Sequence, residues 1–256
     1  MDIRGRVVVV TGGGGGIGGA LCRRFAAEGA SRVVVSDIDP VSAQAVAMEI
    51  GGTAVTADVT VESEVTRLIR GTLEAYGGID IYCSNAGIAF GGGPEASDGA
   101  WRKSWDVHVM AHVYAARALL PRMRQRGEGY IVGTISAAAL LNHILAAPYA
   151  VTKAAGLSFF EWMSIAYHDE GIRVSALCPQ GVRTAMLTQD GERNFLTAGA
   201  LTPEEVAGAV VEAIRDERFL ILPHPEVGEF FQRKASDYDR WLRGMRRLRG
   251  RILQER

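Results

Sequence analysis

Short runs of valine and isoleucine alternate with longer segments of helical period along most of this 256-residue chain. The apolar runs predict seven strands, at residues 6–11, 32–37, 53–57, 79–84, 130–134, 172–177 and 219–222. They lack polar–apolar alternation, so they predict strands that are buried on both faces. Helical segments lie between them at residues 16–28, 40–50, 61–76, 98–126, 149–170 and 203–216. This order predicts an α/β fold, a doubly wound parallel sheet with right-handed crossovers and helices on both faces.

Residues at several helix ends support these boundaries. Asp39 before Pro40 is typical of an N-cap followed by proline at the first helical position, and Gly51 is placed to end that helix. Thr202 with Glu205 three residues later matches a capping box. No linker divides the chain, so we expect a single catalytic domain at residues 1–225 and a C-terminal helical extension at residues 226–256 that is not an independent domain.

Composition excludes several classes of protein. With 48% apolar and 22% charged residues, the chain is typical of a globular protein. Its cysteines, Cys22, Cys83 and Cys178, are far apart and have no histidine at metal-binding spacing, which argues against a disulfide framework and predicts no metal site. We expect each to be a buried thiol in a reducing compartment. No signal peptide and no apolar run of ~18–20 residues is visible, so the sequence predicts a cytoplasmic protein.

Charge is distributed unevenly along the chain. The net charge is −1, but residues 229–256 hold nine basic and four acidic residues. Trp241, Met245, Leu248 and Ile252 form an apolar stripe at helical spacing in this segment, with arginines around it. A basic amphipathic helix can bind nucleic acid or a membrane surface. We expect neither partner here, because such a stripe more often packs on the body of the protein or on a neighbouring subunit.

A run of glycines follows the first predicted strand and opens the first predicted helix. It includes Gly12, Gly16 and Gly18, with Ile17 between the last two. In a Rossmann-type sheet this turn faces the ligand crevice, where glycines let the backbone approach a pyrophosphate at the helix N-terminus. Five consecutive glycines satisfy almost any glycine pattern, so a flexible loop is the alternative. The turn predicts cofactor contacts from Gly12, Gly16 and Ile17.

Asp37 ends the second predicted strand, 19 residues after Gly18. A carboxylate at this position can accept hydrogen bonds from both ribose hydroxyls and would repel a 2′-phosphate. The neighbouring Gly15 and Ile38 carry no charge that could hold such a phosphate. Asp37 therefore predicts NAD as the cofactor, unless it is only a solvated residue at a strand end.

Tyr149 and Lys153 are four residues apart at the start of a predicted helix, so their side chains share one face. A fixed ammonium near a phenol stabilises the phenolate and lowers its pKa toward the range of a general base. Ser136 follows the preceding strand, where its hydroxyl can hold a carbonyl or carbinol oxygen. Alone, Ser136 would be interpreted as a turn residue, but together the three predict catalysis.

These motifs resemble the short-chain dehydrogenase/reductase family in its form of about 250 residues. The resemblance covers roughly residues 4–222 and rests on five motifs in order: the glycine turn beginning at Thr11, Asp58, Asn85-Ala86-Gly87, Ser136, and Tyr149 with Lys153. It implies that Asp58 and Val59 flank the adenine, and that Asn85 and Gly87 line the cofactor wall. It further implies that Tyr149 and Lys153 contact the nicotinamide ribose, and that residues 179–184, with Val182 and Thr184, close over the carboxamide.

Two positions depart from the family pattern. His108 occupies the place of an asparagine that in the family anchors a water of the proton relay. We include His108 among the catalytic candidates, because an imidazole could bind that water. The backbone carbonyl could instead bind it unaided, or His108 could be a packed helix residue. Gln180 follows Pro179 where the family usually has glycine, and it either faces the substrate or points away.

The resemblance implies an NAD-dependent oxidoreductase that interconverts a secondary alcohol and a ketone, with Tyr149 as general acid/base. The expected substrate walls, residues 88–90, 137–147 and 186–200, are mostly apolar and favour a largely apolar alcohol or ketone. His143 either contacts substrate or is an exposed loop residue. The family also implies a homotetramer formed through helices 98–126 and 149–170. The alternatives are an NAD-binding sensor with a basic tail, and a non-redox epimerase or dehydratase of the same fold.

Overall fold

A seven-stranded parallel sheet of order β3-β2-β1-β4-β5-β6-β7 forms the centre of the computed structural model, which describes residues 1–188 and 196–254. All seven predicted strands are confirmed, with ends within two residues of those expected. They are β1 (Val7–Thr11), β2 (Arg32–Asp37), β3 (Thr53–Thr56), β4 (Ile81–Ser84), β5 (Gly129–Thr134), β6 (Ile172–Leu177) and β7 (Leu220–Ile221). The strand order reverses direction between β1 and β4, which is where doubly wound sheets bind their ligands.

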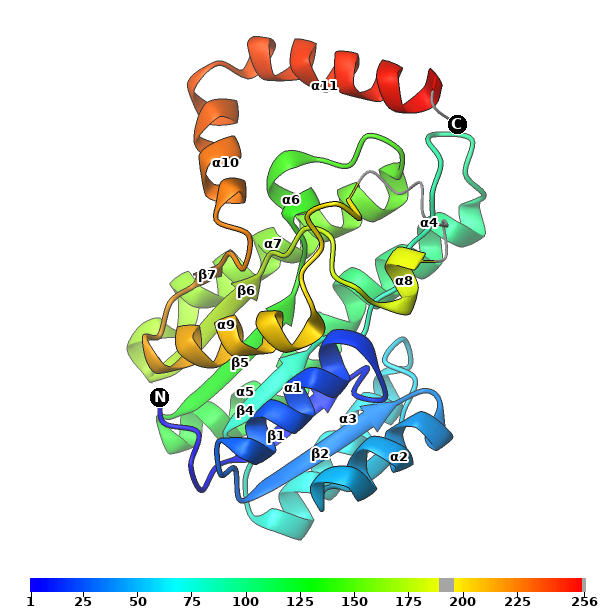
Figure 1. The fold of residues 1–256 in the computed structure, drawn as a ribbon. Helices are drawn as coiled ribbons and strands as arrows, with labels where there is room; N and C mark the ends of the chain where they lie inside the picture. Colours follow the sequence, from blue (N-terminus) through cyan, green and yellow to red (C-terminus); the bar gives the residue numbers. More distant parts are fainter. Residues whose placement is uncertain (189–195, 255–256) are drawn as a thin grey trace.

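Helices cover both faces of the sheet, as predicted (Figure 1). One core lies under α1 (Gly16–Ala27), α2 (Pro40–Ile50) and α9 (Pro203–Arg215), and the other under α3 (Glu62–Tyr76), α5 (Ala111–Arg126) and α7 (Ala147–Tyr167). Successive strand residues point to opposite faces. Accordingly, Val8 and Val10 of β1 are buried in the first core and Val9 in the second.

The predicted helix ends are confirmed where their signals were strongest. The Asp39 carboxylate accepts hydrogen bonds from the backbone N–H groups of Val41 and Ser42 at 3.1 and 3.3 Å. Gly51 ends α2 in the left-handed conformation, with φ of 64°. Thr202 and Glu205 form the expected capping box at the start of α9.

The structure adds local elements that the periodicity did not predict. The expected helix at residues 98–126 consists of α4 (Asp98–Trp105), one π-helical turn (Asp106–Met110) and α5. Short helices form at α6 (Ala137–Leu141) and α8 (Ala185–Thr188), and a 3-10 turn (His168–Glu170) follows α7. Single π turns within α-helices are frequent at functional sites, and this one contains His108.

Two helices form the C-terminal extension. α10 (Glu226–Ser236) rises from the edge of the sheet near β7, and α11 (Tyr238–Gln254) crosses above α6 (Figure 1). The chain bends at Asp237, whose carboxylate accepts a hydrogen bond from the Arg240 N–H at 2.9 Å and so caps α11. Within residues 1–188 and 196–254, no helix combines the length and apolar character needed to cross a membrane.

Candidate active site

A cavity of about 1310 Å³ lies at the carboxyl ends of the strands. Residues that follow β1 to β6 line it, because parallel strands bring their carboxyl ends to the same edge of the sheet. Every sequence-predicted site residue except His108 contributes to its wall: Gly12, Gly16, Ile17, Asp37, Asp58, Val59, Asn85, Gly87, Ser136, Tyr149, Lys153, Val182 and Thr184.

The glycine turn between β1 and α1 leaves room at the cavity floor. A Cβ at Gly18 would lie 1.9 Å from the Gly12 carbonyl oxygen, so no other residue fits this close approach. Gly12 has φ of +63°, and a Cβ there would lie 2.9 Å from the Ala86 Cα. A Cβ at Gly15 would meet nothing within 4 Å, which means that open space faces the N-terminus of α1. The turn fits the pyrophosphate of a dinucleotide, because the helix N-terminus presents free N–H groups there.

Asp37 is held in place by two backbone N–H groups. Its Oδ2 accepts from Gly14 at 3.0 Å and its Oδ1 accepts from Asp39 at 3.1 Å. A carboxylate oxygen retains a further lone pair after one hydrogen bond. Both oxygens of Asp37 can therefore still accept from a ligand hydroxyl, and the arrangement fits an adenine-side ribose.

Asp58 and Lys103 both line the cavity and lie beside each other. The distance between Asp58 Oδ2 and Lys103 Nζ is 3.8 Å. Partial burial raises the pKa of the Asp58 carboxyl, but hydrogen bonds from Thr60 and the Lys103 charge outweigh it, so the pKa lies below its usual value. Lys103 is a cavity residue that the sequence analysis did not single out.

Asn85 joins the ends of three strands. Its Nδ2 donates to the Thr11 carbonyl at 2.9 Å, and its Oδ1 accepts from the Thr134 hydroxyl at 2.9 Å. Asn85 therefore lines the cavity as predicted and also fixes β1, β4 and β5 relative to one another at the site.

Ser136 and Tyr149 meet at the cavity wall. Ser136 begins α6, and its Oγ accepts from the Ala138 N–H at 3.1 Å. This leaves the hydroxyl proton free to donate, and the Ser136 hydroxyl favours the phenolate form of Tyr149 by lowering its pKa. The two oxygens can therefore bind one substrate oxygen between them.

Lys153 lies one turn after Tyr149 on α7 and is buried. Its Nζ donates to the Thr134 carbonyl at 2.8 Å and lies 5.7 Å from the centre of the Tyr149 ring. Burial lowers the pKa of Lys153 to about 7, so its ammonium group is only partly charged near neutral pH.

The expected lowering of the Tyr149 pKa is not found in this structure. Removal of the phenol from water raises its pKa, and the Ser136 hydroxyl opposes that rise only in part. The physical reason is that Lys153 shares the same low-dielectric surroundings, where burial disfavours both charged forms.

His108 lies behind the cavity wall and is fully buried. Its Nε2 accepts from the Ile88 N–H at 3.3 Å, and its Nδ1 is 2.8 Å from the Thr152 hydroxyl. Since Nε2 accepts, Nδ1 must carry the proton and donate to Thr152. Thr152 in turn donates to the Pro148 carbonyl at 2.7 Å. Both ring nitrogens are thus engaged, and burial lowers the pKa of His108 to about 2.

The predicted substrate walls surround the rest of the cavity. The lining residues from these segments are Ile88, Ala89, Phe90, Ala137, Ala138, Leu141, Asn142, His143, Leu145, Ala146, Met186, Leu187 and Leu196. Residues 189–195 of the third segment lie outside the described residues. Gln180 also lines the cavity, and its backbone N–H donates to Nδ1 of the buried His224 at 3.2 Å.

The extension supplies a further wall that the sequence did not assign to this chain's own site. Phe230 and Arg233 of α10 line the cavity, as do Trp241, Gly244, Met245, Leu248 and Arg251 of α11. The apolar stripe at helical spacing was the signal for this wall, but spacing alone does not say which surface a stripe covers. In the part of the chain that the structure describes, no cluster of three or more histidine, cysteine or acidic side chains could hold a metal ion.

Known proteins resemble this chain over most of its length. A family model described as short chain dehydrogenase matches residues 6–194. The 1-deoxy-11-beta-hydroxypentalenate dehydrogenase of Streptomyces exfoliatus is 35% identical over 239 residues, which cover 88% of this chain and 86% of that protein. The 2,5-dichloro-2,5-cyclohexadiene-1,4-diol dehydrogenase of Sphingobium indicum is 37% identical over 191 residues, which cover 73% and 76%.

Solved structures share the same fold. A short chain dehydrogenase/reductase from Burkholderia phymatum in complex with NAD superposes with a TM-score of 0.87 at 27% identity, covering 93% of this chain and 96% of that chain. The 3-ketoacyl-(acyl-carrier-protein) reductase from Brucella melitensis, complexed with NADH, gives 0.80 at 27% identity and covers 86% and 97%. The chain is therefore an oxidoreductase of the short-chain dehydrogenase/reductase family that acts on CH–OH groups.

Proposed function

We propose that this enzyme interconverts a secondary alcohol and a ketone with NAD as cofactor and Tyr149 as general acid/base. The observation that carries the proposal is the presence of Ser136, Tyr149 and Lys153 in one cavity with the glycine turn and Asp37. When bound, NAD supplies a hydride acceptor that carries a positive charge. A sensor would not need the Ser136–Tyr149 pair.

The side chains have separate roles in this proposal. Ser136 donates a hydrogen bond to the carbinol oxygen, and the Tyr149 phenolate accepts its proton. Lys153, tied to the Thr134 carbonyl, holds the ribose hydroxyls, and its ammonium together with the positive charge of bound NAD would offset the rise in the Tyr149 pKa that burial causes. Asp37 accepts from the adenine-side ribose and disfavours a 2′-phosphate, which supports NAD over NADP. In the reverse direction, the Tyr149 phenol returns the proton as the ketone is reduced.

An apolar substrate suits the walls of the cavity, which are mostly aliphatic and aromatic. The two relatives described above are named as dehydrogenases of a hydroxypentalenate and a cyclohexadiene diol, which supports an alcohol as substrate. Incubation with NAD and a panel of secondary alcohols tests the proposal by the absorbance of NADH. Failure of every member of the panel to form NADH above the control without enzyme would contradict it.

We assign His108 the role of a positioning residue, because neither ring nitrogen is free to bind a relay water. Its two hydrogen bonds tie the Ile88 loop to Thr152 of α7, the helix that also carries Tyr149. The ring also packs edge-on against Tyr149, with ring centres 5.4 Å apart. Any relay water would have to bind elsewhere, such as at the backbone carbonyl.

Replacement of His108 by leucine is expected to lower kcat about tenfold and the free energy of unfolding by about 1–3 kcal/mol, because the partly buried Ile88 N–H loses its acceptor. His108→Gln places an amide oxygen near the former Nε2 and should restore part of both. The pH profile of kcat should keep its shape in both variants, since the imidazole is already neutral above pH ~4. A lost or displaced limb of the profile would instead indicate that His108 takes part in proton transfer.

The assembly and compartment are also proposals. Val151, Trp162 and Ile165 are exposed on α7, with 51%, 56% and 83% of their surface accessible. These side chains support a homotetramer formed through α5 and α7. The three thiols are unpaired and buried, which supports a reducing, cytoplasmic compartment. We regard residues 1–225 as the catalytic domain and residues 226–256 as an extension that completes its site.

A further inference from the structure

The C-terminal roof, defined here as α10 and α11 (residues 226–254), is anchored by two hydrogen bonds to the segment at residues 140–144, which borders the cavity. Lys234 Nζ donates to the Leu140 carbonyl of α6 at 2.6 Å. Arg249 Nε donates to the Ile144 carbonyl at 3.1 Å. Ile252 is buried, with 7% of its surface exposed. These contacts fix which side of α11 faces the cavity, so the roof residues form a defined part of the substrate wall.

Only two charged side chains of the described chain line the cavity from the roof, and they differ in their partners. Arg233 forms an ion pair with Glu229 at 3.2 Å and lies over the Phe230 ring. The Arg251 side chain makes no hydrogen bond or ion pair with any residue in 1–188 or 196–254. Within the described ranges, the acidic residues that line the cavity are Asp37 and Asp58, which we place on the adenine side, and Asp58 already lies beside Lys103. Among residues 1–188 and 196–254, no acidic side chain therefore compensates the guanidinium of Arg251.

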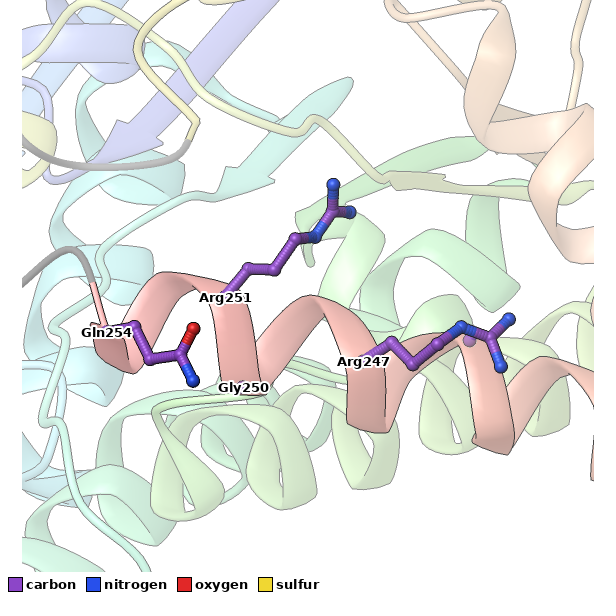
Figure 2. A pocket seen from close by; sticks show the side chains of 5 residues that line it. Arg247, Gly250, Arg251 and Gln254 are labelled. Carbon is purple, nitrogen blue, oxygen red and sulfur yellow. The ribbon is translucent and has the colours of Figure 1, made fainter.

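A basic groove runs along α11 and meets the cavity. It has a volume of about 720 Å³ and is lined by Gly244, Arg247, Gly250, Arg251 and Gln254 (Figure 2). Gly244 and Arg251 line both the groove and the cavity, so the two spaces share a boundary. The glycines lack side chains and leave a recess between the arginines. Arg247 also has no hydrogen-bond or ion-pair partner among the described residues.

We infer that Arg251, assisted by Arg247, binds the carboxylate of a substrate whose secondary alcohol lies at Tyr149. The substrate class is then a hydroxy acid with an apolar body between the two groups, which Trp241, Met245 and Leu248 would cover. A guanidinium matches a carboxylate through two parallel hydrogen bonds, which favours arginine over other cations for this contact. The inference rests on the proposed alcohol oxidation and adds the recognition of a distant anionic group.

The test compares matched charged and neutral substrates. Medium-chain (ω−1)-hydroxy fatty acids of increasing length are assayed with NAD, each beside its methyl ester. The wild-type enzyme should have a higher kcat/KM for the acid than for the ester at the preferred length, through a lower KM. Arg251→Leu should reduce this preference about five- to tenfold, and Arg247→Leu with Arg251→Leu should remove it. Arg246→Leu is the matched control, because Arg246 is exposed on α11 and lines neither space.

Binding provides a second readout that does not depend on turnover. Decanoate is titrated calorimetrically into the NADH-loaded enzyme, and we expect Arg251→Leu to weaken its affinity about fivefold or more, with no change for Arg246→Leu. Two results together would overturn this inference and leave the proposed function standing. The enzyme would oxidise neutral alcohols with no preference for acids, and decanoate affinity would be unchanged in both variants that carry Arg251→Leu. If no alcohol forms NADH, the proposed function fails, and the decanoate titration still decides whether Arg251 binds a carboxylate.

Discussion

Tyr149→Phe is expected to lower kcat for alcohol oxidation by about 10²- to 10⁴-fold, the range that a positioned general acid/base contributes. The substitution removes only the phenol oxygen, so the ring still packs edge-on against His108 and the cavity keeps its shape. NADH binding, measured by fluorescence titration, should therefore stay within about twofold of the wild-type value. The measurement is the rate of NADH formation under saturating alcohol and NAD.

Tyr76→Phe is the matched control for this variant. Its hydroxyl is 2.7 Å from the Thr53 hydroxyl at the edge of the sheet and does not line the cavity. We expect this control to have an unchanged kcat. A Tyr149→Phe enzyme that turns over within tenfold of the wild type would refute the assignment of Tyr149 as general base.

Asp37→Asn is expected to reduce the preference for NAD over NADP by about tenfold or more. Two unit charges 4 Å apart repel by about 1 kcal/mol in bulk water and by about 4 kcal/mol near a protein surface. Replacement of the carboxylate by an amide removes this repulsion toward a 2′-phosphate but keeps an acceptor for the ribose. The measurement is kcat/KM for each cofactor with the same alcohol.

Asp39→Asn provides the control for charge at this strand end. Asp39 caps α2, does not line the cavity, and can be replaced because asparagine caps helices about as well as aspartate. The cofactor preference should be unchanged in this variant. If the Asp37→Asn enzyme retains the full wild-type preference, the carboxylate is not the origin of cofactor selection.

The fold could be predicted because its strands are buried on both faces. Val7 to Val10 and Val33 to Val35 are continuous apolar runs, and only a covered parallel sheet accommodates many such strands separated by helices. The candidate site followed from the same topology, since the carboxyl ends of the strands meet at one edge. Residues as distant in sequence as Gly12, Asp37 and Ser136 therefore line one cavity.

Other features could not be predicted because they depend on tertiary contacts. The π turn at Asp106–Met110 does not interrupt the apolar periodicity, so the sequence gives no sign of it. The hydrogen-bond partners of His108 in this turn, the Ile88 N–H and the Thr152 hydroxyl, come from other segments of the chain. The stripe of Trp241, Met245, Leu248 and Ile252 predicted a buried helix face, but not that its first three residues line the chain's own cavity. The pKa of Tyr149 was expected to fall, and the shared burial of Tyr149 and Lys153 could be seen only in the assembled site.

Transfer of deuterium from the carbinol carbon of a labelled alcohol to NAD tests the central claim most directly. The wild-type enzyme is incubated with NAD and the deuterated secondary alcohol that gives the highest turnover, and the products are analysed by mass spectrometry. We expect singly deuterated NADH in equal amount to the ketone. An epimerase or dehydratase would convert the alcohol without net formation of labelled NADH, and that result would contradict the account.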